Sequence, residues 1–132
     1  DRIMRRALFA AAAVALLPFH AGLAQEANTM QLEAISEIAR CMAQGLPEDW
    51  ASAHMIVELE RPGDSTGNVR YLAARKDAAD TLEPFTPCDT DRPPITLIGL
   101  RRLEPAERQG WTTARLVVER DGTFRLNYDF PK

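Results

Sequence analysis

Residues 111–130, WTTARLVVERDGTFRLNYDF, decide the fold of this chain. Apolar and polar residues alternate on both sides of Asp121-Gly122, the dipeptide most typical of a tight β-turn. The pattern predicts two antiparallel strands, at 111–119 and 123–130. The large side chains of the second strand share one face, and these are Phe124, Leu126, Tyr128 and Phe130.

The length of the turn decides which residues of the first strand pair with these large side chains of the second strand. A two-residue turn would place charged residues, Arg115 and Glu119, in the same layer as the aromatic rings. A three-residue turn that includes Arg120 places only apolar residues there. It pairs Val118 with Phe124, Leu116 with Leu126, and Ala114 with Tyr128. We therefore expect the three-residue turn, with Gly122 in the left-handed conformation that the bulge of such a turn requires.

Outward from this hairpin, the chain predicts a helix and a second hairpin. Residues 28–44 repeat apolar side chains at helical spacing, with Asn28 as N-cap and Gly45 as the residue that ends the helix. The expected apolar stripe is Leu32, Ile35, Ile38, Ala39 and Met42. Residues 52–60 alternate and predict a strand with Ala53, Met55, Val57 and Leu59 on one face. A turn rich in Gly and Pro separates it from a strand at 69–73.

The segment between the two hairpins gives the weakest pattern. Residues 76–92 predict mostly loop. Pro93 and Pro94 can open a short helix, but Ile95, Leu97 and Gly99 also alternate, so a strand is the competing prediction. The whole pattern predicts an α+β fold, in which one helix packs on an antiparallel sheet of about four strands joined by a loop or short-helix connector.

The N-terminal residues are typical of a secretory signal peptide. Arg5 and Arg6 precede an unbroken apolar run at 7–17, and Ala24 ends a small-residue cleavage pattern. We expect residues 1–24 to be removed and residues 25–132 to form a single periplasmic domain. Removing residues 1–24, of net charge +2, from a chain of net charge −3 leaves this domain at about −5. That balance argues against nucleic acid as a partner, and no stable membrane association is expected after cleavage.

Two cysteines remain in the predicted domain, Cys41 and Cys88. Because export leads to an oxidising compartment, we expect them to form a disulfide. Together with the domain's only histidine, His54, they provide no paired-ligand motif, so we expect neither metal nor cofactor. His54 lies among strand residues and has no serine in a nucleophile motif, and we expect no enzymatic activity.

Exposed aromatic and acidic side chains are the candidates for partner binding. Trp50 and Trp111 each stand at the start of a strand and either cap the core or anchor an interface. Glu119, Asp121 and Asp129 could form an acidic edge that faces a basic partner, although exposed hairpin charges are more often simply solvated. The candidate partner-binding set is Asp49, Trp50, Glu119, Asp121, Tyr128 and Asp129.

The same C-terminal hairpin resembles the ending of the YezG-like family of immunity proteins. The shared features are the Trp111-Thr112 strand, the Asp121-Gly122 turn and the closing Tyr128-Asp129-Phe130, with Pro47-Glu48-Asp49-Trp50 similar to the family's step after its first helix. The resemblance covers about residues 32–130. It implies a non-enzymatic antitoxin that binds a cognate protein toxin.

This chain departs from that family in three respects, namely the signal peptide, the cysteine pair and the prolines in its central segment. Export favours a toxin that attacks the cell envelope. The leading hypothesis is therefore a periplasmic immunity protein that occludes a secreted toxin. The alternative is a periplasmic inhibitor or accessory module that binds an envelope or host enzyme, and a toxin gene next door would favour the first.

Overall fold

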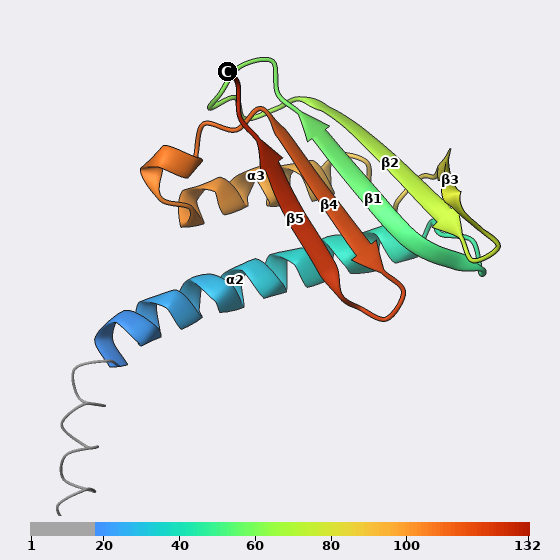
Figure 1. Ribbon diagram of the computed structural model, residues 1–132, viewed down its shortest axis with the longest axis horizontal. Coiled ribbons are helices and arrows are strands. Elements are labelled where there is room, and N and C mark those ends of the chain that lie inside the picture. The colour runs from blue at the N-terminus through green and yellow to red at the C-terminus, as the bar shows by residue number, and fades with distance from the viewer. Residues whose placement is uncertain (1–17) are drawn as a thin grey trace, which may run out of the picture. The chain divides into compact units, whose positions relative to one another are not determined.

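The computed structural model describes residues 18–132, with side chains from residue 28 onward. The described strands belong to one compact unit, Ala34–Lys132. Figure 1 shows a twisted antiparallel sheet with α3 and the C-terminal part of α2 behind it. The predicted signal peptide lies outside the described residues over 1–17, and its last residues belong to α2. No helix within 18–132 has the length and apolar character needed to cross a membrane.

The sheet has five strands in the order β3-β2-β1-β4-β5. The strands are β1 (Trp50–Glu58), β2 (Asn68–Arg75), β3 (Ala78–Pro84), β4 (Thr113–Glu119) and β5 (Phe124–Asp129). All neighbours are antiparallel, and β1 joins the N-terminal and C-terminal halves by pairing with both β2 and β4. The predicted α+β class is confirmed, with five strands in place of about four.

The β4–β5 hairpin has the register that the sequence predicts. Val118 pairs with Phe124, Leu116 with Leu126, and Ala114 with Tyr128. The Glu119 N–H donates to the Thr123 carbonyl at 2.8 Å, which closes the three-residue turn. Gly122 has a φ of 93°, as the bulge requires.

Replacing Gly122 by alanine should lower the free energy of unfolding by about 1–2 kcal/mol, because a Cβ is disfavoured at this positive φ. Chemical denaturation measures the change. Gly110→Ala is the matched control, since a Cβ there meets no atom within 4 Å and the backbone is not left-handed. Equal effects of the two substitutions would contradict the turn geometry.

The strand β3 corrects the prediction of a loop over 76–92. Its residues, AADTLEP, carry no alternating apolar pattern because almost every side chain on this edge strand is exposed. The other strands are recognised by apolar residues on their one buried face, and β3 has no buried face. Its pairing with β2 is also irregular between Ala73 and Arg75.

The helix α2 spans Pro18–Ala43, so it begins before the predicted start and Asn28 lies inside it, not at an N-cap. Residues 19–27 contain helix formers and no proline, which leaves nothing to stop the helix at Asn28. Ile35, Ile38 and Met42 are buried in the core as expected. Leu32, predicted for the same stripe, is 51 % exposed.

After the sheet's first half the chain forms α3 (Arg92–Gly99), followed by η1 (Leu100–Leu103) and η2 (Ala106–Arg108). Pro93 and Pro94 occupy the first helical turn, where their missing N–H groups would have no intrahelical acceptor, so the helical prediction is confirmed over the strand. Leu97 and Ile98 face the core. Ile95, which the competing strand would place on the same face as Leu97, is 64 % exposed.

The core lies between the helices and one face of the sheet. The alternating set predicted for β1 is buried with Tyr71 of β2, Leu116 of β4 and Leu97 of α3. Trp111 is completely buried and stacks on Tyr128, with ring centroids 5.2 Å apart. Of the two readings of Trp111, core residue and interface anchor, the structure selects the core.

A disulfide joins the end of α2 to the segment after β3, because Cys41 and Cys88 are bonded with a Cα separation of 4.9 Å. The Cys88 N–H also donates to the Cys41 carbonyl at 2.9 Å. The predicted disulfide is therefore present. Gly45 was expected as the glycine that ends the helix, but its role here is to let two chain segments approach closely. Its φ is not positive, and a Cβ there would lie 1.7 Å from the Thr86 carbonyl oxygen, so the close approach of the two segments requires glycine.

Candidate functional site

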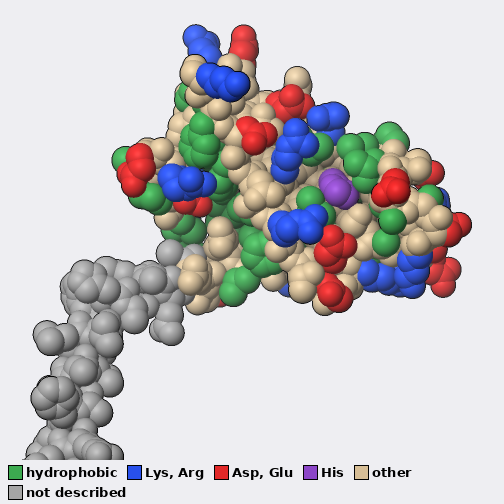
Figure 2. All heavy atoms as spheres, viewed as in Figure 1, with side chains coloured by type: hydrophobic (Ala, Val, Ile, Leu, Met, Phe, Trp, Pro, Cys, Tyr) green, Lys and Arg blue, Asp and Glu red, His purple; other side chains and the backbone are tan. Residues whose placement is uncertain are grey.

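One face of the sheet is left uncovered by the helices of residues 18–132 and has the clearest pattern of exposed side chains. We call it the open face. Its side chains alternate along each strand with the buried ones. Figure 2 shows this face, with basic and acidic side chains interspersed among hydrophobic ones. The open face comprises His54, Ile56 and Glu58 of β1, Arg70 and Leu72 of β2, Arg115, Val117 and Glu119 of β4, and Arg125, Asn127 and Asp129 of β5.

The middle of the open face is apolar. His54 lies directly between Leu72 of β2 and Val117 of β4 in the strand register. In the next row Ile56 lies between two arginines, Arg70 and Arg115, and is only 6 % exposed. Long arginine stems can cover apolar surface while the guanidinium remains in water, which accounts for a buried isoleucine on a face without a covering helix.

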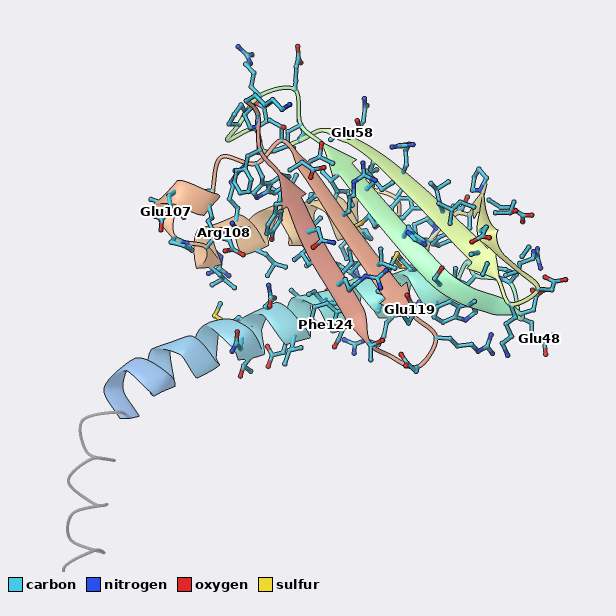
Figure 3. All side chains as sticks on the ribbon, in the orientation of Figure 1. Glu48, Glu58, Glu107, Arg108, Glu119 and Phe124 are labelled. Atoms are coloured by element: carbon cyan, nitrogen blue, oxygen red, sulfur yellow. A yellow bond between two sulfur atoms is a disulfide. The ribbon has the colours of Figure 1, made fainter. Side chains whose placement is uncertain are left out.

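Charges of both signs surround this centre and form three ion pairs. Arg70 contacts Glu58 at 3.3 Å, Arg115 contacts Asp129 at 3.6 Å, and Arg125 contacts Glu119 at 3.8 Å. Figure 3 labels Glu58 and Glu119, which lie at opposite ends of the face. All these side chains are substantially exposed, so each pair contributes about 0–1 kcal/mol to stability. Their main effect is to set a pattern of charge.

His54 supplies the imidazole of the open face, the one type of side chain that ordinarily titrates near neutral pH. Its Nε2 lies 3.1 Å from the Ser52 Oγ. Within residues 28–132 no ion pair joins His54 to a carboxylate, so no acid orients the ring as a nucleophile–base pair would need. Partial burial lowers the pKa of His54, the nearby Glu119 charge raises it, and Arg125 lowers it further.

His54 should titrate below its ordinary pKa, and its neighbours should move that pKa in opposite directions. Glu119→Gln should lower the pKa further, and Arg125→Gln should raise it, as NMR of the imidazole C–H signals can measure. The unfolded chain then binds the proton more readily than the folded one. The resulting stability is present above the unfolded pKa, and it is lost as pH falls from about 6.5 through the folded pKa.

In His54→Gln this part of the pH dependence of stability should disappear. Shifts of the same sign in Glu119→Gln and Arg125→Gln would contradict the arrangement of charges on the open face.

Four of the predicted partner-binding residues lie at one end of the sheet. Asp49 pairs with Arg75, and Trp50 is half-buried beneath the Arg120 guanidinium, which lies 5.7 Å from the ring centroid. Arg120 also donates to the Glu48 and Trp50 carbonyls. Glu119 ends β4 nearby, and the Asp121 carboxylate accepts hydrogen bonds from Thr123, which lower its pKa. These contacts fold the turn back onto the start of β1.

The other two predicted residues lie elsewhere. Asp129 is level with Thr113 and Glu58, at the opposite end of the sheet from Glu119. Of the two interpretations of Glu119, Asp121 and Asp129, the single acidic edge is therefore wrong. Tyr128 points to the helix-covered face. Its hydroxyl is buried without a hydrogen-bond partner among the described residues, and burial raises its pKa to about 12.

The residues of the open face that the candidate set omitted are mostly arginines and aliphatics. Arginines on an alternating strand are typical of a solvated face, so Arg70, Arg115 and Arg125 gave no separate signal. The available signal was Ile56, an apolar residue at a polar position of the alternation. It lies one row from His54, where Leu72 and Val117 approach from the two neighbouring strands.

The chain matches no protein-family model, and no curated protein is significantly similar to it. Among the described residues, no group of three or more His, Cys, Asp or Glu side chains is placed to hold a metal ion. A function for this chain is therefore inferred from the geometry of the open face.

Proposed function

We propose that this protein is a periplasmic immunity protein that binds a cognate secreted toxin through the open face and neutralises it by direct occlusion. The observation that carries the proposal is the arrangement beside Ile56, where an apolar centre of Leu72 and Val117 flanks the His54 imidazole and has a rim of mixed charge. Protein–protein interfaces share this anatomy, with apolar residues at the centre and polar residues around them.

The scaffold supports this proposal because the middle of the open face lies on the three central strands, β2, β1 and β4, whose other side packs on the core. The disulfide also ties α2 to the segment beyond β3. A preorganised surface loses little conformational entropy on binding. A disulfide also suits a protein that works in an oxidising compartment.

The charge pattern makes the interface selective. Basic and acidic side chains alternate around the apolar centre, so a partner must present the complementary order of charges and not simply a net charge. The charged members of the candidate set from the sequence are all acidic, whereas the open face carries charges of both signs. A toxin whose active site is bordered by both signs of charge fits the open face.

A protection assay tests the proposal. If a gene next to this one encodes a secreted protein, that protein is the candidate toxin. It is directed to the periplasm with and without this protein, and survivors are counted. The combined substitution Leu72→Glu and Val117→Glu should abolish protection, because it places two charges in the apolar centre. Ile95→Glu is the matched control, since Ile95 is exposed on α3, away from the open face, and it should leave protection intact.

Circular dichroism and thermal unfolding must show that the variants fold. A toxic neighbour that kills equally with and without this protein would refute the pairing. Protection that survives the double substitution in a folded protein would refute the open face as the binding surface.

A further inference from the structure

Among residues 18–132, no strand pairs with the outer edge of β5. The order of the sheet places β5 at its end, as Figure 1 shows. The Glu119 N–H donates to the Thr123 carbonyl, and hydrogen bonding alternates along the hairpin. The backbone N–H and C=O groups of the odd-numbered residues of β5 therefore point toward β4. Phe124, Leu126 and Tyr128 therefore direct their N–H and C=O groups outward. Such an edge can pair with another strand.

The opposite edge, β3, carries features that discourage pairing. Two acids, Asp80 and Glu83, lie on it, Pro84 ends it, and its register with β2 shifts. Acids that repel a like strand, proline and irregular register are common ways to protect an edge. β5 has continuous register with β4 and contains no proline. The two edges of one sheet are thus built differently.

The sequence of β5 is complementary to itself in one antiparallel register. In a pair of antiparallel β5 strands from two copies, hydrogen bonds can form only between even-numbered residues, because only their backbone groups point outward. This requirement leaves a few ways to align the two strands about a two-fold axis. Alignments that centre on Arg125 or on Asp129 set like charges opposite each other. Centring on Leu126 or on Tyr128 sets Arg125 or Asp129 opposite Asn127, so it forms no pair of opposite charges. Centring on Asn127 sets Arg125 of one copy opposite Asp129 of the other, twice by symmetry.

We propose that two copies of this chain associate through β5, in antiparallel orientation about Asn127, to form one continuous sheet. The interface is isologous, because the same strand contributes to both sides of the two-fold axis. On the helix-covered side, Leu126 lies opposite Tyr128 of the second copy, and Phe124 lies opposite Phe130. Phe130 is 37 % exposed in the single chain, so this pairing gives it an apolar neighbour.

The present ion pairs of Arg125 and Asp129 do not prevent this exchange. Arg125 contacts Glu119 at 3.8 Å and Asp129 contacts Arg115 at 3.6 Å, and the side chains of both residues are more than half exposed. Such pairs contribute little and can be shared with a second copy. The association does not depend on the proposed toxin binding, since edge pairing leaves the apolar centre of the open face uncovered.

Sedimentation measurements on the oxidised protein test the association. A single short edge buries little area, so we expect a weak dimer that appears as concentration rises from about 10 µM to about 1 mM. A monomer at every concentration would overturn the proposal and would leave the edge free for a strand of a different protein.

Charge reversal tests the register. Arg125→Asp alone and Asp129→Arg alone should each raise the dimer Kd about tenfold or more, because two attractive cross-strand pairs become repulsive. An equimolar mixture of the two variants should restore association. In the mixed dimer the two substituted side chains, of opposite charge, face each other, and the unchanged Asp129 of one chain faces the unchanged Arg125 of the other. The double reversal in one chain should also dimerise.

Arg70→Asp is the matched control, because it removes an equally exposed ion pair from β2, away from the edge. It should leave the dimer Kd unchanged. Single reversals that associate as the unmodified protein does, or a mixture of the two folded variants that fails to associate, would overturn the register.

Discussion

Replacing both Cys41 and Cys88 by alanine should lower the free energy of unfolding by about 4 kcal/mol. The disulfide closes a loop with a sequence separation of 47 residues, and a cross-link of that span removes conformational entropy from the unfolded chain. For a domain of this size the loss is a large part of the total stability. Urea unfolding of the oxidised protein and of the variant measures it.

A reducing agent provides the control for this prediction. Reduction of the unmodified protein should lower its stability to about the level of the alanine variant, and the same agent should leave the variant unchanged. A variant within about 1 kcal/mol of the oxidised protein would show that the bond adds little to the contacts that already hold Cys88 beside Cys41.

Replacing Trp111 by alanine should destabilise the protein by about 3–5 kcal/mol, the range for removing a buried tryptophan. The indole is completely buried, and the ring of Tyr128 stacks against it, so its loss leaves a cavity beside a second aromatic residue. Chemical unfolding monitored by circular dichroism measures the change without relying on tryptophan fluorescence.

Two substitutions make this prediction specific. Trp111→Phe should recover most of the stability, because it keeps an aromatic ring beside Tyr128 and removes an indole N–H that has no partner among the described residues. Trp50→Ala should cost less than Trp111→Ala, because Trp50 is only half-buried at the start of β1. Equal losses at the two tryptophans would contradict their different positions.

The sequence predicts the parts of the fold where the alternative arrangement has a clear energetic cost. The β4–β5 register followed because a shift of one residue would bury Arg115 and Glu119 beside aromatic rings. Pro93 and Pro94 predicted a helix start for an equally local reason. By contrast, β3 was missed because an exposed edge strand has no apolar alternation, and the start of α2 was misplaced because nothing stops a helix at Asn28.

The candidate site was harder to predict because it depends on which strands are neighbours. His54, Leu72 and Val117 come from three strands, and only the pairing of β1 with both β2 and β4 brings them together. Strand alternation assigns each residue to a face but does not order the strands. The sequence therefore predicted the polar face of each strand but not which strands are neighbours. The candidate set also grouped Tyr128 with Asp129, although these side chains point to opposite faces of the sheet.

The order of the strands also determines when each part of the structure can form as the chain is made. β1 acquires its neighbour β2 early, but its other neighbour, β4, is synthesised only after α3 and the two short 3₁₀ helices. Both cysteines precede β4, so the covalent link, once the chain reaches an oxidising environment, needs no residue of the second half of the sheet. The link therefore ties the end of α2 to the three-stranded half of the sheet, and the remaining edge of β1 is paired only when β4 and β5 dock on it.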